Sequence, residues 1–162
     1  MQKGKQKEPW VGIIIFKNNG EIVLVEKNKH QQDKLSLSIP GGRLENDGDE
    51  TKQTAEECAI REVREETGIV LENIRLLEQC DNIFNEDGQE KRRGWLFIAH
   101  AKSTELNVED KREISKTQWV NLSGIDNLPI KERFKKIILK FQQEILREIK
   151  LTHEGSERGP RL

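Results

Sequence analysis

Three glutamates lie within one short segment of the chain, and their spacing is that of neighbours on a helix. Glu62 and Glu66 are four residues apart, and Glu62 and Glu65 are three apart, so on a helix their like charges would repel. Carboxylate oxygens are the ligands that hard divalent cations take, and such a cation would remove the repulsion. The cluster therefore predicts a metal site and metal-assisted chemistry on a phosphate-bearing substrate.

The apolar pattern around the glutamates predicts the helix that must position them. This helix runs from about Thr54 to Thr67, and Gly68 is placed to end it in a left-handed conformation. Its apolar stripe consists of Ala55, Ala59, Ile60 and Val63.

A helical wheel with about 100° per residue places the acids relative to this stripe. Glu62 and Glu66 fall at its shoulder, whereas Glu65 falls further round the helix. Carboxylates beside an apolar face need a partner. Arg61 is within reach of Glu57 and Glu65 at a spacing of four residues, so we expect it to orient an acid.

The other elements predicted from the pattern are mostly strands. Pro40-Gly41-Gly42 favours a tight turn or a close backbone approach, and the polar segment 45–53 and segment 104–116 are expected to be loops. Apolar positions at a nearly helical period predict one helix over 128–150. The predicted strands are 11–16, 21–26 with alternating apolar and polar residues, 35–39, 69–79 with a turn near Glu72-Asn73, 95–99 and 117–122. Mixed elements of this kind fit one sheet with helices.

The motif Pro40-Gly41-Gly42, followed by Arg61 to Ile69, resembles the Nudix box. The second half of that box reads R-E-U-x-E-E-x-G-U, with U a bulky aliphatic residue, and residues 61–69 match it at every specified position. The first half departs from the pattern, because Gln53 stands at the position of its glutamate and Asp47 at that of its glycine. We interpret the difference as an insertion within 45–53, where Glu50 is the nearest alternative acid.

The resemblance implies an α/β fold: a Nudix-type α/β/α sandwich around a mixed β-sheet, with an amphipathic C-terminal helix. It also implies hydrolysis of a pyrophosphate linkage in a nucleoside diphosphate derivative or a nucleoside triphosphate, with Mg²⁺ or Mn²⁺ as the cofactor. By position in the motif, Glu62, Glu65 and Glu66 would hold the metal, the Gly41 carbonyl would add a ligand, and Arg61 would orient the acids.

The general base and the substrate contacts are predicted less directly. Glu109, Asp110 and Glu113 precede the Trp119 strand, and a loop acid can activate a water; Glu113 is our candidate catalytic residue, with a solvated surface acid as the alternative. Arg43 and Gly42 are the candidate substrate-binding residues, and guanidinium groups bind phosphate well. The other residues considered for substrate contacts are Arg92, Arg93, Phe16, Phe84, Trp95 and Phe97, of which the aromatic ones are expected to be core.

Length and composition limit the other possibilities. The 162 residues are enough for one domain, which we place at 9–150 between a flexible N-terminus (1–8) and a disordered tail (151–162). The formal net charge of −1 gives no indication of a basic surface that would bind nucleic acid or an anionic membrane. The polar start and the absence of a long apolar run predict neither a secretory signal nor a membrane span. The two cysteines, Cys58 and Cys80, have no CxxC spacing, so we expect reduced thiols in a cytoplasmic protein. The histidines are scattered and predict no metal site; they are His30, His100 and His153.

Two alternatives stay open at this stage. The same residues are compatible with a non-catalytic nucleotide-binding or sensor module of the same fold, since fold alone does not give activity. The amphipathic helix over 130–150 is compatible with an interaction protein, and the chain with a monomer or a homodimer. Within the family, a downstream tyrosine marks the diadenosine-polyphosphate pattern and a downstream proline the ADP-ribose pattern. No tyrosine is present here and no proline lies between 40 and 129. The sequence therefore matches neither pattern, and we expect only a nucleotide-type small molecule as the substrate.

Overall fold

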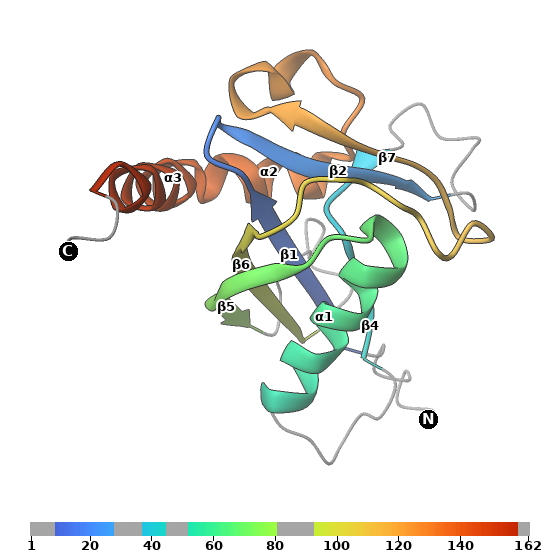
Figure 1. The fold of residues 1–162 in the computed structure, drawn as a ribbon. Helices are drawn as coiled ribbons and strands as arrows, with labels where there is room; N and C mark the ends of the chain where they lie inside the picture. Colours follow the sequence, from blue (N-terminus) through green and yellow to red (C-terminus); the bar gives the residue numbers. More distant parts are fainter. Residues whose placement is uncertain (1–8, 28–36, 45–51, 81–92, 159–162) are drawn as a thin grey trace, which may run out of the picture.

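The computed structural model describes residues 9–27, 37–44, 52–80 and 93–158, and Figure 1 shows how they fold. The elements are β1 (Trp10–Phe16), β2 (Glu21–Lys27), β3 (Leu37–Ser38), β4 (Gly41–Arg43), α1 (Lys52–Thr67), β5 (Leu71–Cys80), β6 (Gly94–Ala101), β7 (Ile114–Asn121), the 3₁₀ helix η2 (Leu122–Asn127), α2 (Glu132–Lys140) and α3 (Gln142–Arg158).

The strands of the described residues form one mixed sheet. Its main path is β3-β2-β1-β6-β5, while β4 pairs with β1 and β7 pairs with β2. The central pair, β1 and β6, is parallel and in unbroken register from Trp10↔Gly94 to Phe16↔His100, and the other pairings are antiparallel. Both central strands are apolar along nearly their whole length, as expected for strands covered on both faces.

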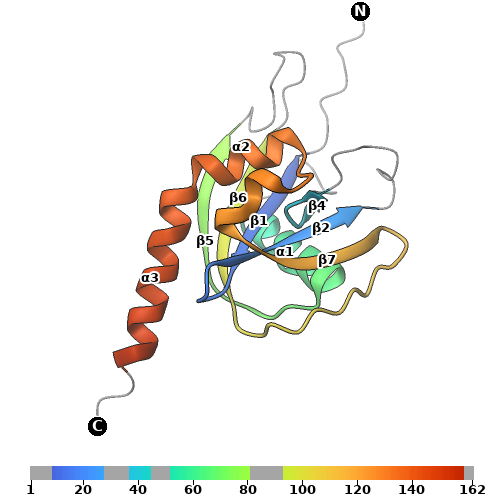
Figure 2. The same cartoon turned by 90° about the horizontal axis from the view of Figure 1, so that it is seen from above.

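The helices cover the two faces of this sheet separately. Alternation along β1 sends Val11, Ile13 and Ile15 into the core beneath α1, and Ile14 and Phe16 into the core beneath α2. Figure 2 shows α1 on one face, α2 across the other, and α3 running beside β5. The predicted sandwich of two helical layers around a mixed sheet is therefore confirmed.

The C-terminal prediction of one helix over 128–150 is wrong in two respects. The chain forms two helices, with Phe141 outside helical geometry between them (φ −101°, ψ 11°). The second helix, α3, runs beside β5, where its Ile145 and Ile149 are buried in the core against which Leu77 of that strand packs. Arg75 of β5 adds ion pairs with Glu144 and Glu148 at the surface. Since α3 continues to Arg158, the disorder expected from residue 151 is wrong for 151–158, and 159–162 lie outside the described residues.

The sheet also corrects several local predictions. Of the two alternatives for the glycine pair, the close backbone approach is confirmed and the tight turn is wrong, because Gly41–Arg43 is a strand paired with β1. Strand β7 begins at Ile114 within the predicted loop, because pairing with β2 extends it. In β5 the expected turn is a bulge, with Asn73 at φ 55°. The predicted alternation in β2 is wrong, since its residues 22–25 are buried on both faces.

Other predicted segments fall wholly or partly outside the described residues: 1–8, 28–36, 45–51 and 81–92. In the part of the chain that is described, no helix is long and apolar enough to cross a membrane.

Candidate functional site

Helix α1 presents its three acids at graded depth, and Glu65 is the shallowest, as the helical wheel predicts. The side chain of Glu66 is 1% exposed, that of Glu62 is 13% exposed and that of Glu65 is 34% exposed. Gly68, at φ 74°, ends the helix as expected, and its N–H donates to the carbonyls of Val63 and Arg64. The deepest acid is therefore fixed in the last turn of the helix, against the sheet.

The glycine pair of β4 brings the main chain close to these acids. The Gly41 N–H donates a 2.8 Å hydrogen bond to Glu66 Oε1. A Cβ on Gly42 would lie 2.6 Å from Glu62 Oε1, so only glycine leaves room for that carboxylate in its present place. Glu66 Oε2 is buried and has no hydrogen-bond donor among the residues that the structure describes.

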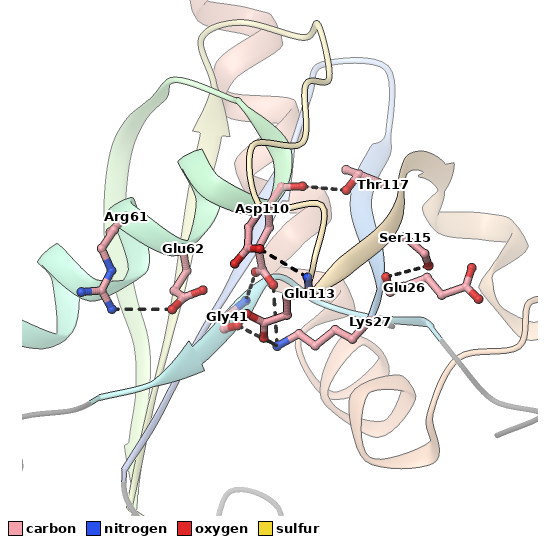
Figure 3. A network of polar contacts seen from close by, with 10 residues as sticks. Glu26, Lys27, Gly41, Arg61, Glu62, Asp110, Glu113, Ser115 and Thr117 are labelled. Atoms are coloured by element: carbon pink, nitrogen blue, oxygen red, sulfur yellow. Dashed lines mark hydrogen bonds and ion pairs between the residues drawn. The ribbon is translucent and has the colours of Figure 1, made fainter. Parts of the chain in front are cut away.

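Lys27 completes the site, and the sequence did not reveal it. Its Nζ donates to the Gly41 carbonyl at 2.9 Å and lies 3.6 Å from Glu66 Oε2 and 3.8 Å from Glu113 Oε1; Figure 3 shows the lysine reaching between Gly41 and Glu113. Strand alternation could have indicated it, because Val23 and Val25 of the same strand face the core under α1.

Main-chain hydrogen bonds attach the segment before β7 to the end of α1. The amides of Glu109 and Asp110 both donate to the Glu65 carbonyl, and the amide of Asn107 donates to the Thr67 carbonyl. The Thr117 hydroxyl donates to the Glu66 carbonyl at 2.7 Å. These bonds satisfy carbonyls that a helix terminus leaves without partners, and they hold the loop acids beside the acids of α1.

An open cleft of about 620 Å³ lies between α1 and this segment. Glu113 is 37% exposed there, and its amide donates to Asp110 Oδ1 at 3.3 Å. Of the residues described, those that line the cleft are Glu65, Glu109, Asp110, Arg112 and Glu113. Four carboxylates against one guanidinium make this cleft unfavourable for an anionic substrate unless further positive charge is brought in.

Arg61 lies beside the acids, as predicted from its spacing. Its guanidinium is 3.6 Å from Glu62 Oε1 and 4.0 Å from Glu65 Oε1, and Figure 3 shows it reaching towards Glu62. It also contacts the buried sulfur of Cys58, which is a free thiol. The arginine can therefore restrain two of the three acids of α1.

Burial controls the proton affinity of the deep acids. It raises the pKa of Glu66 to about 8, against the smaller lowering effects of the Lys27 charge and the Gly41 hydrogen bond. Burial likewise raises the pKa of Glu62, and Lys27 again acts in the opposite direction. The lysine is thus the strongest of the groups that favour the ionised form of either acid.

The donor set fits a hard divalent cation in its chemistry. The Glu66 carboxylate, the Glu62 carboxylate and the Gly41 carbonyl offer oxygens of the kind that Mg²⁺ prefers, and Glu66 Oε2 is a buried acceptor without a donor. As they stand, however, no three acidic, histidine or cysteine side chains of the described residues converge closely enough to hold one ion.

Other predicted site residues lie away from this cluster. Arg43 is exposed at the end of β4 and is not among the described residues that line the cleft. The aromatic residues Phe16, Trp95 and Phe97 are core residues, as expected. The imidazole of His100 forms hydrogen bonds with Glu72 and Asn18. Gln53 lies in the first turn of α1. Four further residues lie outside the described part of the chain: Asp47, Glu50, Phe84 and Arg92.

Comparison with known proteins gives the family and the fold. A family model described as NUDIX domain matches residues 7–141. An RNA pyrophosphohydrolase of Novosphingobium aromaticivorans is 24% identical, over 88% of this chain and 96% of that protein. An NAD-capped RNA hydrolase, NudC, of Vibrio parahaemolyticus is 30% identical over 72% of this chain, which spans only 39% of that relative's length.

A solved structure shares the fold. The NUDIX domain of Shewanella oneidensis NrtR, complexed with ADP ribose, has a TM-score of 0.70 at 19% identity, covering 87% of this chain and 90% of that one. At this identity the likeness speaks for the architecture alone.

Proposed function

The chain belongs to the Nudix family, and from this premise we propose that it is a divalent-metal-dependent hydrolase of pyrophosphate linkages. Its substrate would be a nucleoside diphosphate derivative or a nucleoside triphosphate. Both relatives described above carry hydrolase names. The observation that carries the proposal is the buried Glu66 carboxylate, one oxygen of which binds the Gly41 amide while the other has no hydrogen-bond donor among the described residues.

The residues that would hold the metal are Glu62, Glu65, Glu66 and the carbonyl of Gly41. When bound, a Mg²⁺ or Mn²⁺ ion supplies the positive charge that the acidic cleft lacks and that phosphoryl transfer needs. Arg61 restrains Glu62 and Glu65 from the solvent side. Gly42 has no side chain, so the Glu62 carboxylate can rest against β4.

Glu113 is the residue that we assign to proton transfer from the attacking water. It borders the cleft, is partly exposed to water, and reaches the same lysine as Glu66. Its amide is bound to Asp110, whose own amide is bound to the end of α1. These bonds hold the main chain of Glu113 beside the acids of α1, and a carboxylate placed there can accept a proton from water.

A panel of nucleotide substrates tests the proposal. Nucleoside triphosphates, ADP-ribose, dinucleotides and 5′-triphosphorylated RNA are incubated with Mg²⁺ or Mn²⁺, and released phosphate, pyrophosphate and nucleotide are identified. We expect turnover of at least one member with metal and none with EDTA. If every member stays intact while one of them raises the melting temperature, the non-catalytic binding module is the correct interpretation.

A further inference from the structure

Lys27 is the cation that lies against the Gly41 carbonyl and the Glu66 carboxylate. Its ammonium group contacts the Gly41 carbonyl and the Glu66 carboxylate, both assigned above to the metal, and also approaches Glu113. The lysine side chain is only 14% exposed, so its charge is held in the site rather than in bulk solvent. Lysine normally keeps its ammonium in water, so the burial of Lys27 indicates that its charge has a function in this site.

The end of β2 aims the lysine inward. Lys27 follows Val23 and Val25 on the strand face that packs towards α1, and the pairing with β7 shifts register between Glu26 and Lys27. The extra residue, Ser115, belongs to β7, so β2 keeps its alternation and Lys27 points to the same side as Val23 and Val25. The same pairing sets Lys27 opposite Ile114, which is next to Glu113 in the chain.

The ammonium and a divalent ion require the same oxygens. A Mg²⁺ ion binds oxygens at about 2.0–2.1 Å, whereas the Gly41 carbonyl now accepts from Nζ at 2.9 Å. Two cations sharing that carbonyl and the Glu66 carboxylate would be close enough to repel each other strongly in a buried setting. With Lys27 in place, the described acidic side chains do not converge on one point.

We infer that Lys27 and the divalent ion are alternative cations for the Gly41–Glu66 pair, so that Lys27 must leave this pair before the metal binds. The inference rests on the proposed function, because it takes the same residues as the metal site. Lys27 would then stabilise the metal-free protein and weaken its metal affinity.

Metal binding by lysine variants gives the first test. Mn²⁺ is titrated calorimetrically into the wild type, into Lys27→Met, and into Lys116→Met, which removes the same charge from an exposed position on β7. We expect roughly tenfold tighter binding for Lys27→Met, because the competing occupant is gone, and unchanged binding for Lys116→Met. In EDTA, Lys27→Met should melt at a lower temperature than the wild type.

The outcomes separate the two proposals. Equal or weaker Mn²⁺ binding by Lys27→Met, with normal binding by the wild type, overturns the role of Lys27 and leaves the hydrolase proposal standing. If the wild type binds no Mn²⁺ at all, the metal site itself is wrong and the hydrolase proposal fails with it.

A second measurement needs no variant and detects displacement directly. Wild-type protein is treated with an amine-acylating reagent in EDTA or in Mg²⁺, and modification of each lysine is quantified by mass spectrometry. Withdrawal of Lys27 from its carbonyl and carboxylate partners should raise its modification in Mg²⁺, while that of Lys116 stays constant. Unchanged or reduced modification of Lys27 in Mg²⁺, at concentrations where Mn²⁺ or Mg²⁺ binds, overturns the inference.

Discussion

Gly41 and Glu66 are 25 residues apart in the chain, yet the amide of the first binds a carboxylate oxygen of the second at 2.8 Å. This bond joins the two halves of the sequence motif, β4 and the last turn of α1. It leaves the other carboxylate oxygen buried without a donor among the described residues. Glu66 is consequently the acid on which the site depends most.

We expect Glu66→Gln to abolish turnover while the fold stays intact. Glutamine can still accept from the Gly41 amide, but it cannot supply a charged metal ligand. Steady-state hydrolysis of the best panel substrate and circular dichroism measure the two effects. Glu57→Gln, an exposed acid on the same helix, is the control and should keep wild-type turnover; retained activity in Glu66→Gln would refute the site assignment.

Gly42→Ala should weaken metal binding more than it weakens the fold. The added Cβ would lie 2.6 Å from Glu62 Oε1, and the end of a flexible side chain can move aside. The Glu62 carboxylate would then leave its place against β4. We expect a raised Kd for Mn²⁺ by calorimetry and a nearly unchanged melting temperature, with Gly124→Ala, whose Cβ would meet nothing within 4 Å, as the control. Normal Mn²⁺ affinity would show that Glu62 does not need this position.

Without metal, stability should fall as the pH rises through the window set by Glu66. Burial raises its pKa from 4.5 to about 8, so between these values the folded protein holds a proton that the unfolded chain has released. The free energy of unfolding therefore decreases with rising pH in this window. Melting temperatures in EDTA between pH 4.5 and 8 should fall more steeply for the wild type than for Glu66→Gln; equal slopes would contradict the assignment.

Gly68→Ala should destabilise the protein by about 1–3 kcal/mol. Gly68 has φ 74°, and a Cβ there would lie 2.6 Å from the Asn107 carbonyl. The substitution strains the helix end and pushes away the segment attached to it. Chemical denaturation measures the loss, Gly124→Ala again serves as the control, and a loss no larger than that of the control would show that the contact yields easily.

Gln53→Ala should have little effect on turnover. The residue stands where the first acid of the motif would be, and we attribute the mismatch to the insertion within 45–53. A kinetic comparison with the wild type decides the matter. Complete loss of turnover would show that Gln53 takes over that acid's role.

The sequence predicted the parts of the site that are local. The shallower position of Glu65 relative to Glu62 and Glu66 followed from one helical wheel, and the glycine helix stop from one residue. Lys27 was missed because its neighbours come from β4, α1 and the segment before β7, which are far apart in the chain and meet only when the sheet pairs and α1 packs on it. The start of β7 was missed for the same reason, since pairing rather than apolar pattern defines it.

The break at Phe141 shows another limit of pattern reading. A helical period continues through this residue, so periodicity alone cannot distinguish one long helix from two. The burial of Ile145 and Ile149 in the core beside Leu77 joins residues far apart in the chain. The direction of α3 depends on such contacts with the sheet, which the periodicity of the helix itself does not reveal.

The attachment of residues 107–110 to α1 has a practical consequence for redesign. The attachment is made by the main-chain amides of residues 107, 109 and 110. The side chains of Val108, which packs against the core, and Asp110, which accepts from the Glu113 amide, also shape this wall. Libraries that alter substrate preference should therefore begin at position 109, where any residue except proline keeps the main-chain bond.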